Sequence, residues 1–98
     1  MVDPRQRPRT GGRVWLDDLR HEPGGAILYA AVLYLPESEH VADVTVAADG
    51  TVAFGAWSPP DPPAWLLDYA RQFLRGEWRA RQVPDPPPWP ERITRWRG

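Results

Sequence analysis

The sequence predicts a small α+β domain, a two-layer sandwich in which an antiparallel sheet of three to four strands carries one main helix on one face. Three observations predict it: an amphipathic segment from Ala64 to Trp78, a hairpin signal at Asp49-Gly50, and ten consecutive apolar residues from Ala26 to Leu35. An amphipathic helix cannot bury its apolar side alone, so it needs a second layer. The strands that precede it are expected to supply that layer.

The helix is predicted from the spacing of its apolar residues. Apolar residues recur every four positions in two neighbouring rows. The first row is Trp65, Tyr69 and Phe73, and the second is Leu66, Ala70, Leu74 and Trp78. Together they form a broad apolar stripe with a period near 3.6. Asp61 is expected to cap the first turn, and Pro62 and Pro63 suit a helix start. We expect the helix to extend to about Arg81, before Pro84 stops it.

The first half of the chain is expected to supply two strands. The run from Ala26 to Leu35 can be a strand or a buried helix by periodicity alone, and its β-branched and tyrosine residues favour a central strand. Tyr29 and Tyr34 would then point to opposite faces. The segment from Val14 to Glu22 fits neither period well, and we interpret it as a short edge strand. A turn at 22–25 separates the two.

The hairpin prediction rests on alternation around a turn. Val41 to Ala47 and Thr51 to Trp57 alternate apolar and polar residues, and Asp49-Gly50 between them favours a type I′ turn, in which both central residues have positive φ. The segment from Ser58 to Pro63 is too rich in proline for a strand or helix interior. It is expected to be a stiff linker that returns the chain across the sheet.

The two ends differ from the body of the chain. Residues 1–12 combine arginines with proline and glycine and are predicted to be a disordered basic arm, leaving residues 13–98 as a single domain. The C-terminal tail, residues 83–98, begins with an extended proline-rich stretch. A short helix after Pro90 would then place Trp89, Ile93 and Trp96 on one side. We expect this tail to pack on the domain as a strap or to dock on a partner.

Composition excludes several functional classes. The 98 residues include no cysteine, so disulfides and cysteine-ligated zinc are impossible. No apolar run is long enough for a membrane helix, and the N-terminus does not resemble a secretory signal, so a cytoplasmic protein without membrane contact is expected. All 12 basic residues are arginine, which is typical of codon bias in a GC-rich genome, and the alternative is a choice of arginine for its forked, planar contacts. Net charge is +3 over residues 1–13, −7 over 14–74 and +3 over 75–98.

The sequence contains no catalytic signature. His21 and His40 fall in predicted polar loops and are interpreted as solvated residues. Metal ligation by His40 together with Glu37, Glu39 and Asp43 is the weaker interpretation. The adjacent pair at 17–18 consists of two acids that would point in different directions, and no phosphate-binding glycine loop or nucleophile elbow is present. We therefore expect a protein that is not an enzyme and has no cofactor or metal.

Two binding functions remain. The first is a protein-interaction module or homodimer that uses exposed aromatic or proline-rich surface. The second is single-stranded nucleic-acid binding through the arginines and tryptophans of the C-terminal region, which combine cations with stacking rings. The candidate binding residues are Trp78, Trp89, Trp96, Arg79, Arg92 and Arg95. The sheet face opposite the helix, with Tyr34, Thr45 and Trp57 expected on it, becomes the best interaction surface if it is uncovered and apolar.

Overall fold

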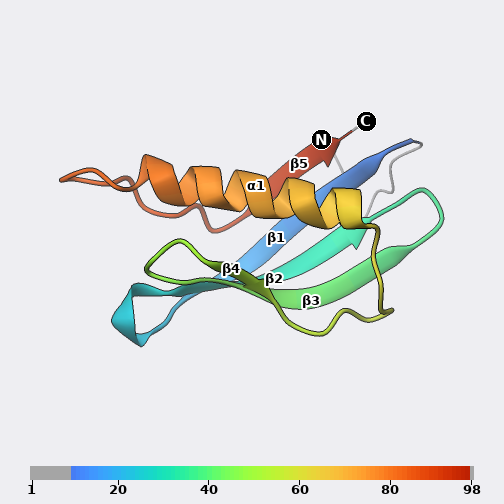
Figure 1. Cartoon of the computed structure of the whole chain (residues 1–98), viewed down its shortest axis with the longest axis horizontal. Coiled ribbons are helices and arrows are strands. Elements are labelled where there is room, and N and C mark those ends of the chain that lie inside the picture. The colour runs from blue at the N-terminus through green and yellow to red at the C-terminus, as the bar shows by residue number, and fades with distance from the viewer. Residues whose placement is uncertain (1–9, 98) are drawn as a thin grey trace.

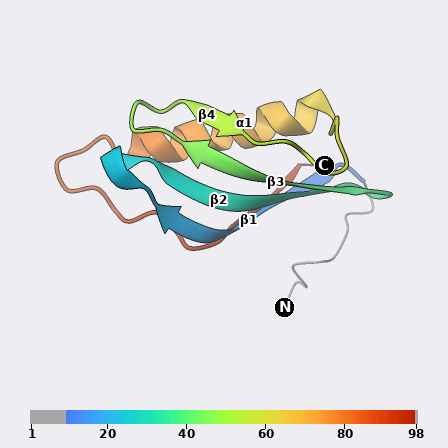
Figure 2. The same ribbon diagram turned by 90° about the horizontal axis from the view of Figure 1, so that it is seen from below.

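A computed structural model describes residues 10–97 of this chain. A five-stranded antiparallel sheet forms one layer and a single long helix, α1, forms the other (Figure 1). Viewed from below, the helix lies along one face of the sheet, while the opposite face carries no helix from the described part of the chain (Figure 2). In chain order the elements are β1 (Gly12–His21), η1 (Pro23–Gly25), β2 (Ile27–Tyr34), β3 (Glu39–Val46), β4 (Val52–Phe54), α1 (Ala64–Ala80) and β5 (Ile93–Arg97).

The α+β class and the helix on one face of an antiparallel sheet are confirmed, but the number of strands is five. The strand order is β4-β3-β2-β1-β5, so the last strand of the chain lies beside the first. Most of the predicted disordered arm, residues 1–9, lies outside the described residues, and β1 begins at Gly12.

The tail is the reason for the extra strand. Residues 93–97 form β5 and pair antiparallel with β1, with Leu16 opposite Ile93 and Arg13 opposite Trp96. The predicted short helix with Trp89, Ile93 and Trp96 on one side is therefore wrong at this point. In a strand, residues an odd number of positions apart point to opposite faces, so Ile93 lies on the helix-covered face and Trp96 on the other.

Strand β1 is a strand, as predicted, but it is neither short nor at an edge. It has ten residues and lies between β2 and β5. The pairing with β2 shifts register between Asp17 and Arg20, and Asp18 has a φ of 58°. This irregularity is a β-bulge. It explains why the segment fits no single period: the bulge changes which residues face the helix after Asp17.

The buried core lies between the sheet and α1. Strand β2 is central, as predicted, and alternate residues of β2 and β3 pair across the strands toward the helix, as in Ile27 with Val46 and Tyr29 with Val44. Tyr29 and Tyr34 point to opposite faces, as predicted. The core consists of Val14, Leu16, Ile27, Tyr29, Ala31, Leu33, Val44, Val46, Val52, Leu66, Ala70, Leu74 and Ile93.

The hairpin between β3 and β4 is confirmed, but its turn is not type I′. Ala47 N–H donates to the Thr51 carbonyl, and Gly50 N–H donates to the Ala47 carbonyl. The loop therefore has three residues, and only Gly50, with a φ of 91°, has positive φ within it. This arrangement is the common three-residue hairpin, which needs a left-handed residue at its last position alone.

Helix α1 follows the predicted range closely. Its most buried residues are Leu66, Ala70 and Leu74, so the second apolar row faces the centre of the sheet. The first row, with Tyr69 and Phe73, lies partly buried beside it. The residue at the N-cap position is Pro63, and no side chain caps the helix. The expected cap by Asp61 is therefore wrong: Asp61 precedes the helix with a φ of 61°.

Candidate binding surfaces

The helix-free face of the sheet presents its side chains in cross-strand rows. Residues that pair directly across antiparallel strands point to the same face, so the pairing registers define these rows. One row runs from β5 to β3 as Trp96, Arg13, Tyr34 and Glu39. The next row runs as Thr94, Trp15, Val32 and Val41. We refer to these two rows as the open-face patch.

Apolar and aromatic side chains dominate this patch. Val41 is 46% exposed and Trp96 is 45% exposed, and they lie on strands at opposite sides of the patch. Trp15 and Val32, which are half-buried, lie in the second row on the strands between them. The prediction that Tyr34 and Thr45 lie on this face is consistent with the strand pairing, but Trp57 does not. Its ring packs 5.4 Å from Phe54, which pairs with Val44 on the helix side.

A buried arginine, Arg13, contacts three aromatic rings of the open-face patch. Arg13 is only 1% exposed, and its guanidinium carbon lies 5.4 Å from the Trp15 ring centroid, 5.8 Å from that of Tyr34 and 4.9 Å from that of Trp96. Its Nε donates to the Thr94 hydroxyl at 3.0 Å. Cation–π contacts of this kind strengthen when they are removed from water. The cluster brings both tryptophans of the patch into contact with one buried cation.

Beyond the patch the same face becomes charged. Asp17, Ala30 and Asp43 form the next row, followed by Arg20, Leu28 and Thr45. Arg20 lies 3.7 Å from a carboxylate oxygen of Asp43 and 3.7 Å from one of Asp18. The apolar patch is thus bordered by side chains of both signs.

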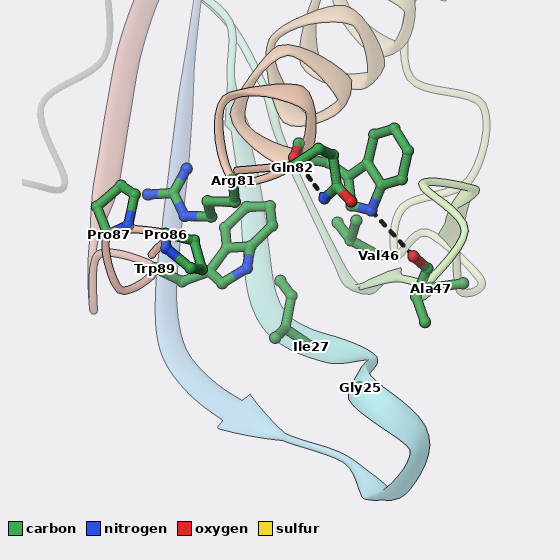
Figure 3. A pocket seen from close by; sticks show the side chains of 11 residues that line it. Gly25, Ile27, Val46, Ala47, Arg81, Gln82, Pro86, Pro87 and Trp89 are labelled. Atoms are coloured by element: carbon green, nitrogen blue, oxygen red, sulfur yellow. Dashed lines mark hydrogen bonds between the residues drawn. The ribbon is translucent and has the colours of Figure 1, made fainter. Parts of the chain in front are cut away.

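A second feature lies at the C-terminal end of α1. A cavity of about 240 Å³ opens between the last turn of the helix, the proline-rich loop that follows it and the near ends of β2 and β3 (Figure 3). Two tryptophans, Trp78 and Trp89, line it together with Ile27 and Val46. We call this feature the two-tryptophan pocket.

The structure divides the candidate binding residues among separate places. Trp78 and Trp89 line the two-tryptophan pocket, and Trp96 belongs to the open-face patch. Arg79 is exposed in the last turn of α1. Sequence spacing did not indicate Arg13 and Trp15, because Arg13 was expected at the margin of the domain and β1 at an edge. Nor did it indicate that Arg81 contacts the Trp89 ring.

Several arginines of the C-terminal region are paired with acids of the same chain. Arg92 Nε lies 3.1 Å from Asp17, and Glu77 accepts from Arg81 at 2.7 Å and lies 3.6 Å from Arg95. Arg95 and Arg97 also lie over the rings of Phe73 and Tyr69 on the helix. These arginines connect the tail to the helix and to β1.

The predicted solvated histidine at position 40 is buried instead. His40 is 7% exposed in β3, and its Nδ1 lies 2.7 Å from the Pro59 carbonyl oxygen. A carbonyl oxygen can only accept, so Nδ1 donates this bond. Within residues 10–97 no group of three or more acidic, histidine or cysteine side chains could hold a metal ion. No helix in that range is long and apolar enough to cross a membrane.

Comparison with known proteins adds no assignment to this two-layer α+β domain. A scan of protein-family models, a search of curated proteins and a search of solved structures each return no match to this chain. The basis for inferring its function is therefore the open-face patch and the two-tryptophan pocket.

Proposed function

We propose that this protein is a protein-interaction module whose open-face patch pairs with a second copy of the chain. The observation that carries the proposal is the position of the exposed apolar residues. Trp96 and Val41 are among the few large apolar residues left exposed in the described chain, and the strand pairing places both on the face that no helix of residues 10–97 covers. Half-buried Trp15 lies on a strand between them, and aromatic residues are the usual anchors of protein interfaces.

The tryptophans of the patch also have unused polar groups. Within residues 10–97 the indole N–H groups of Trp15 and Trp96 have no hydrogen-bond partner. A tryptophan in an interface buries its large ring and donates its N–H to an acceptor of the partner. Because Arg13 fixes both rings in advance, little side-chain entropy would be lost on binding.

Charge favours a second copy as the partner. Two acids of this face, Asp43 and Asp17, are each paired with an arginine of the same chain, Arg20 and Arg92. A surface of one sign would repel itself, whereas a mixed surface can meet its own copy without net repulsion. Four strands ~4.8 Å apart and about eight residues at ~3.4 Å each give the whole face a flat area of very roughly 500 Å². A standard interface buries ~800 Å² per partner, so a dimer would use the whole face, including the charged rows beyond the patch.

The test is the mass of the protein in solution. We expect sedimentation equilibrium to show a dimer, and Trp96→Ser to raise its dissociation constant at least ~10-fold, the equivalent of ~1.4 kcal/mol. Trp65→Ser is the matched control, because Trp65 is also 45% exposed but lies in the first turn of α1. It should leave the dissociation constant unchanged. A monomer at near-millimolar concentration, or equal effects of the two variants, would overturn the proposal.

A further inference from the structure

We infer that the two-tryptophan pocket is a separate binding site, one that takes up a proline ring of an extended, proline-rich segment from another protein. The site lies at the C-terminal end of α1 and shares no residue with the open-face patch. The inference is therefore independent of the proposed dimer. It rests on the walls of the pocket, on their rigidity and on the hydrogen-bonding groups that they present.

The wall formed by Trp78 is fixed from two sides. Its indole Nε1 donates to the Ala48 carbonyl at 3.1 Å (Figure 3). Gly50 of the hairpin packs so closely against the same ring that an added Cβ would lie 2.8 Å from it. The helix and the β3-β4 hairpin therefore hold this indole in one orientation.

The wall formed by Trp89 is fixed by different partners. The guanidinium carbon of Arg81 lies 4.5 Å from the centroid of the Trp89 ring. The Tyr29 ring meets the Trp89 ring edge-on, with 6.4 Å between the two ring centroids. Arg81 in turn donates to Glu77 and to the Pro88 carbonyl, and the Tyr29 hydroxyl donates to the Pro90 carbonyl. The Arg81 side chain is only 10% exposed. Because both walls are ordered before a ligand arrives, binding has little ordering entropy to overcome.

The pocket contains hydrogen-bond donors and few acceptors. No acidic side chain lines it, the Ala48 carbonyl already accepts from Trp78, and Gln82 is the lining residue with a side-chain amide oxygen. The indole N–H of Trp89 has no partner among the described residues and is not enclosed by protein atoms. A polyproline II segment matches this inventory, because prolines have carbonyl acceptors but no N–H donor. Its rings also stack on aromatic side chains in the known modes of proline-rich recognition.

The size of the pocket limits the ligand. Its volume of about 240 Å³ is smaller than the ~300–1,000 Å³ of pockets that bury a drug-sized molecule. One or two pyrrolidine rings between an apolar floor and two indoles fit such a space. The apolar floor consists of Ile27 and Val46, which pair directly across β2 and β3.

The proline-rich segments within residues 10–97 do not fit this role. Pro86 and Pro87 are part of the wall. In the segment from Ser58 to Pro63, Asp61 has a φ of 61°, whereas polyproline II needs φ near −75°. Pro62 is buried against the domain. The occupant is therefore assigned to another protein.

The experiment is a titration of the full chain with a synthetic oligoproline peptide, followed by the NMR signals of the indole N–H groups. We expect the Trp89 N–H signal to move downfield on binding while that of Trp96 stays in place. Ala47→Phe, which places a ring in the pocket, should weaken binding at least tenfold, and Trp89→Phe, which keeps a ring but removes the N–H, should weaken it several-fold. A peptide in which alanines replace the prolines should bind at least tenfold more weakly.

Two controls keep this test separate from that of the dimer. Trp96→Ser should leave peptide affinity unchanged, and Ala47→Phe should leave the mass in solution unchanged. If oligoproline does not bind at millimolar concentration, or binds equally well to Ala47→Phe, the inference is wrong. If binding moves the Trp96 signal but not the Trp89 signal, the pocket is not the site, and the inference is overturned as well.

Discussion

Tyr29 connects three parts of the molecule. It lies on the helix side of the central strand β2 and is fully buried. Its ring contacts Trp89, and its hydroxyl donates to the Pro90 carbonyl, so the loop after α1 is attached to the middle of the sheet. Burial raises the pKa of Tyr29 to about 12, while nearby Arg81 acts to lower it. The phenol is therefore protonated, and able to donate, throughout the neutral range.

This pKa predicts a loss of stability in alkali. Below pH ~10, the usual tyrosine pKa, the phenol is protonated in both states and its contribution is fully present. As the pH rises from ~10 toward the folded pKa, the unfolded state loses the proton first, so the free energy of unfolding falls by up to ~2–3 kcal/mol. Urea unfolding across that range should show this fall, and Tyr29→Phe should show a smaller one. An equal fall in both proteins would contradict the assignment, because Tyr34 and Tyr69 are present in each.

Substitution by alanine is expected to change the free energy of unfolding in opposite directions at two glycines. Gly50→Ala should destabilise the protein by ~2 kcal/mol or more, because the position has positive φ and the new Cβ would lie 2.8 Å from the Trp78 ring. Gly76→Ala is the control, because nothing lies within 4 Å of its Cβ position in the middle of α1. It should stabilise the protein by ~0.5–1 kcal/mol. Urea unfolding of the two variants measures both values, and a destabilising Gly76→Ala would contradict the packing described for the helix.

At the level of the elements, β5 is the one whose type was mispredicted. Trp89, Ile93 and Trp96 have helical spacing, but helical spacing is only a local signal. Strand β1 would otherwise present an unpaired edge beside the core, and β5 satisfies its backbone groups along five pairs. Ile93, 3% exposed, then completes the core from that side. A long-range pairing partner therefore decided between helix and strand.

This role of β5 predicts a large cost for shortening its buried side chain. Ile93→Ala should destabilise the protein by ~2–4 kcal/mol, because it removes buried methyl groups and leaves a cavity. The neighbouring Arg92→Ala is the control, since it removes only an exposed ion pair with Asp17, worth ~0–1 kcal/mol. Thermal or urea unfolding distinguishes them. A small effect of Ile93→Ala would mean that the tail is a dispensable strap rather than part of the sheet.

At the level of the whole molecule, the charge distribution leads to different expectations for the two candidate binding functions. The basic C-terminal region folds against acids of the body, through Arg92 with Asp17 and through Arg81 and Arg95 with Glu77. Because these arginines already pair with carboxylates of the same chain, they are less available to bind the phosphates of a nucleic acid. The open-face patch, by contrast, has exposed apolar residues whose burial would stabilise a complex without counterion release.

Salt dependence tests this difference. We expect the dimer constant to change by less than ~3-fold between ~0.1 and ~1 M salt, because apolar contacts are little affected by screening. Binding to single-stranded nucleic acid would instead weaken by orders of magnitude over that range. Sedimentation and titration of a fluorescent oligonucleotide at the two salt concentrations measure both. Tight, steeply salt-dependent oligonucleotide binding by a monomeric protein would favour the nucleic-acid function.

The sequence by itself determined the features that depend on neighbouring residues. Helix α1 follows from the spacing of its apolar rows, the β3-β4 hairpin from the alternation around Gly50, and the opposite orientation of Tyr29 and Tyr34 from strand geometry. The sequence also indicated Trp78, Trp89 and Trp96 as candidates for binding, because they lie among arginines and so combine stacking rings with cations.

Only the tertiary structure decided what depends on partners distant in the chain. It paired the last strand with the first, buried Arg13 among three rings and His40 against Pro59, and chose which apolar row of α1 faces the sheet. It also separated Trp96 from Trp78 and Trp89. Local spacing does not record these contacts, because each one forms between segments that meet only when the two layers pack.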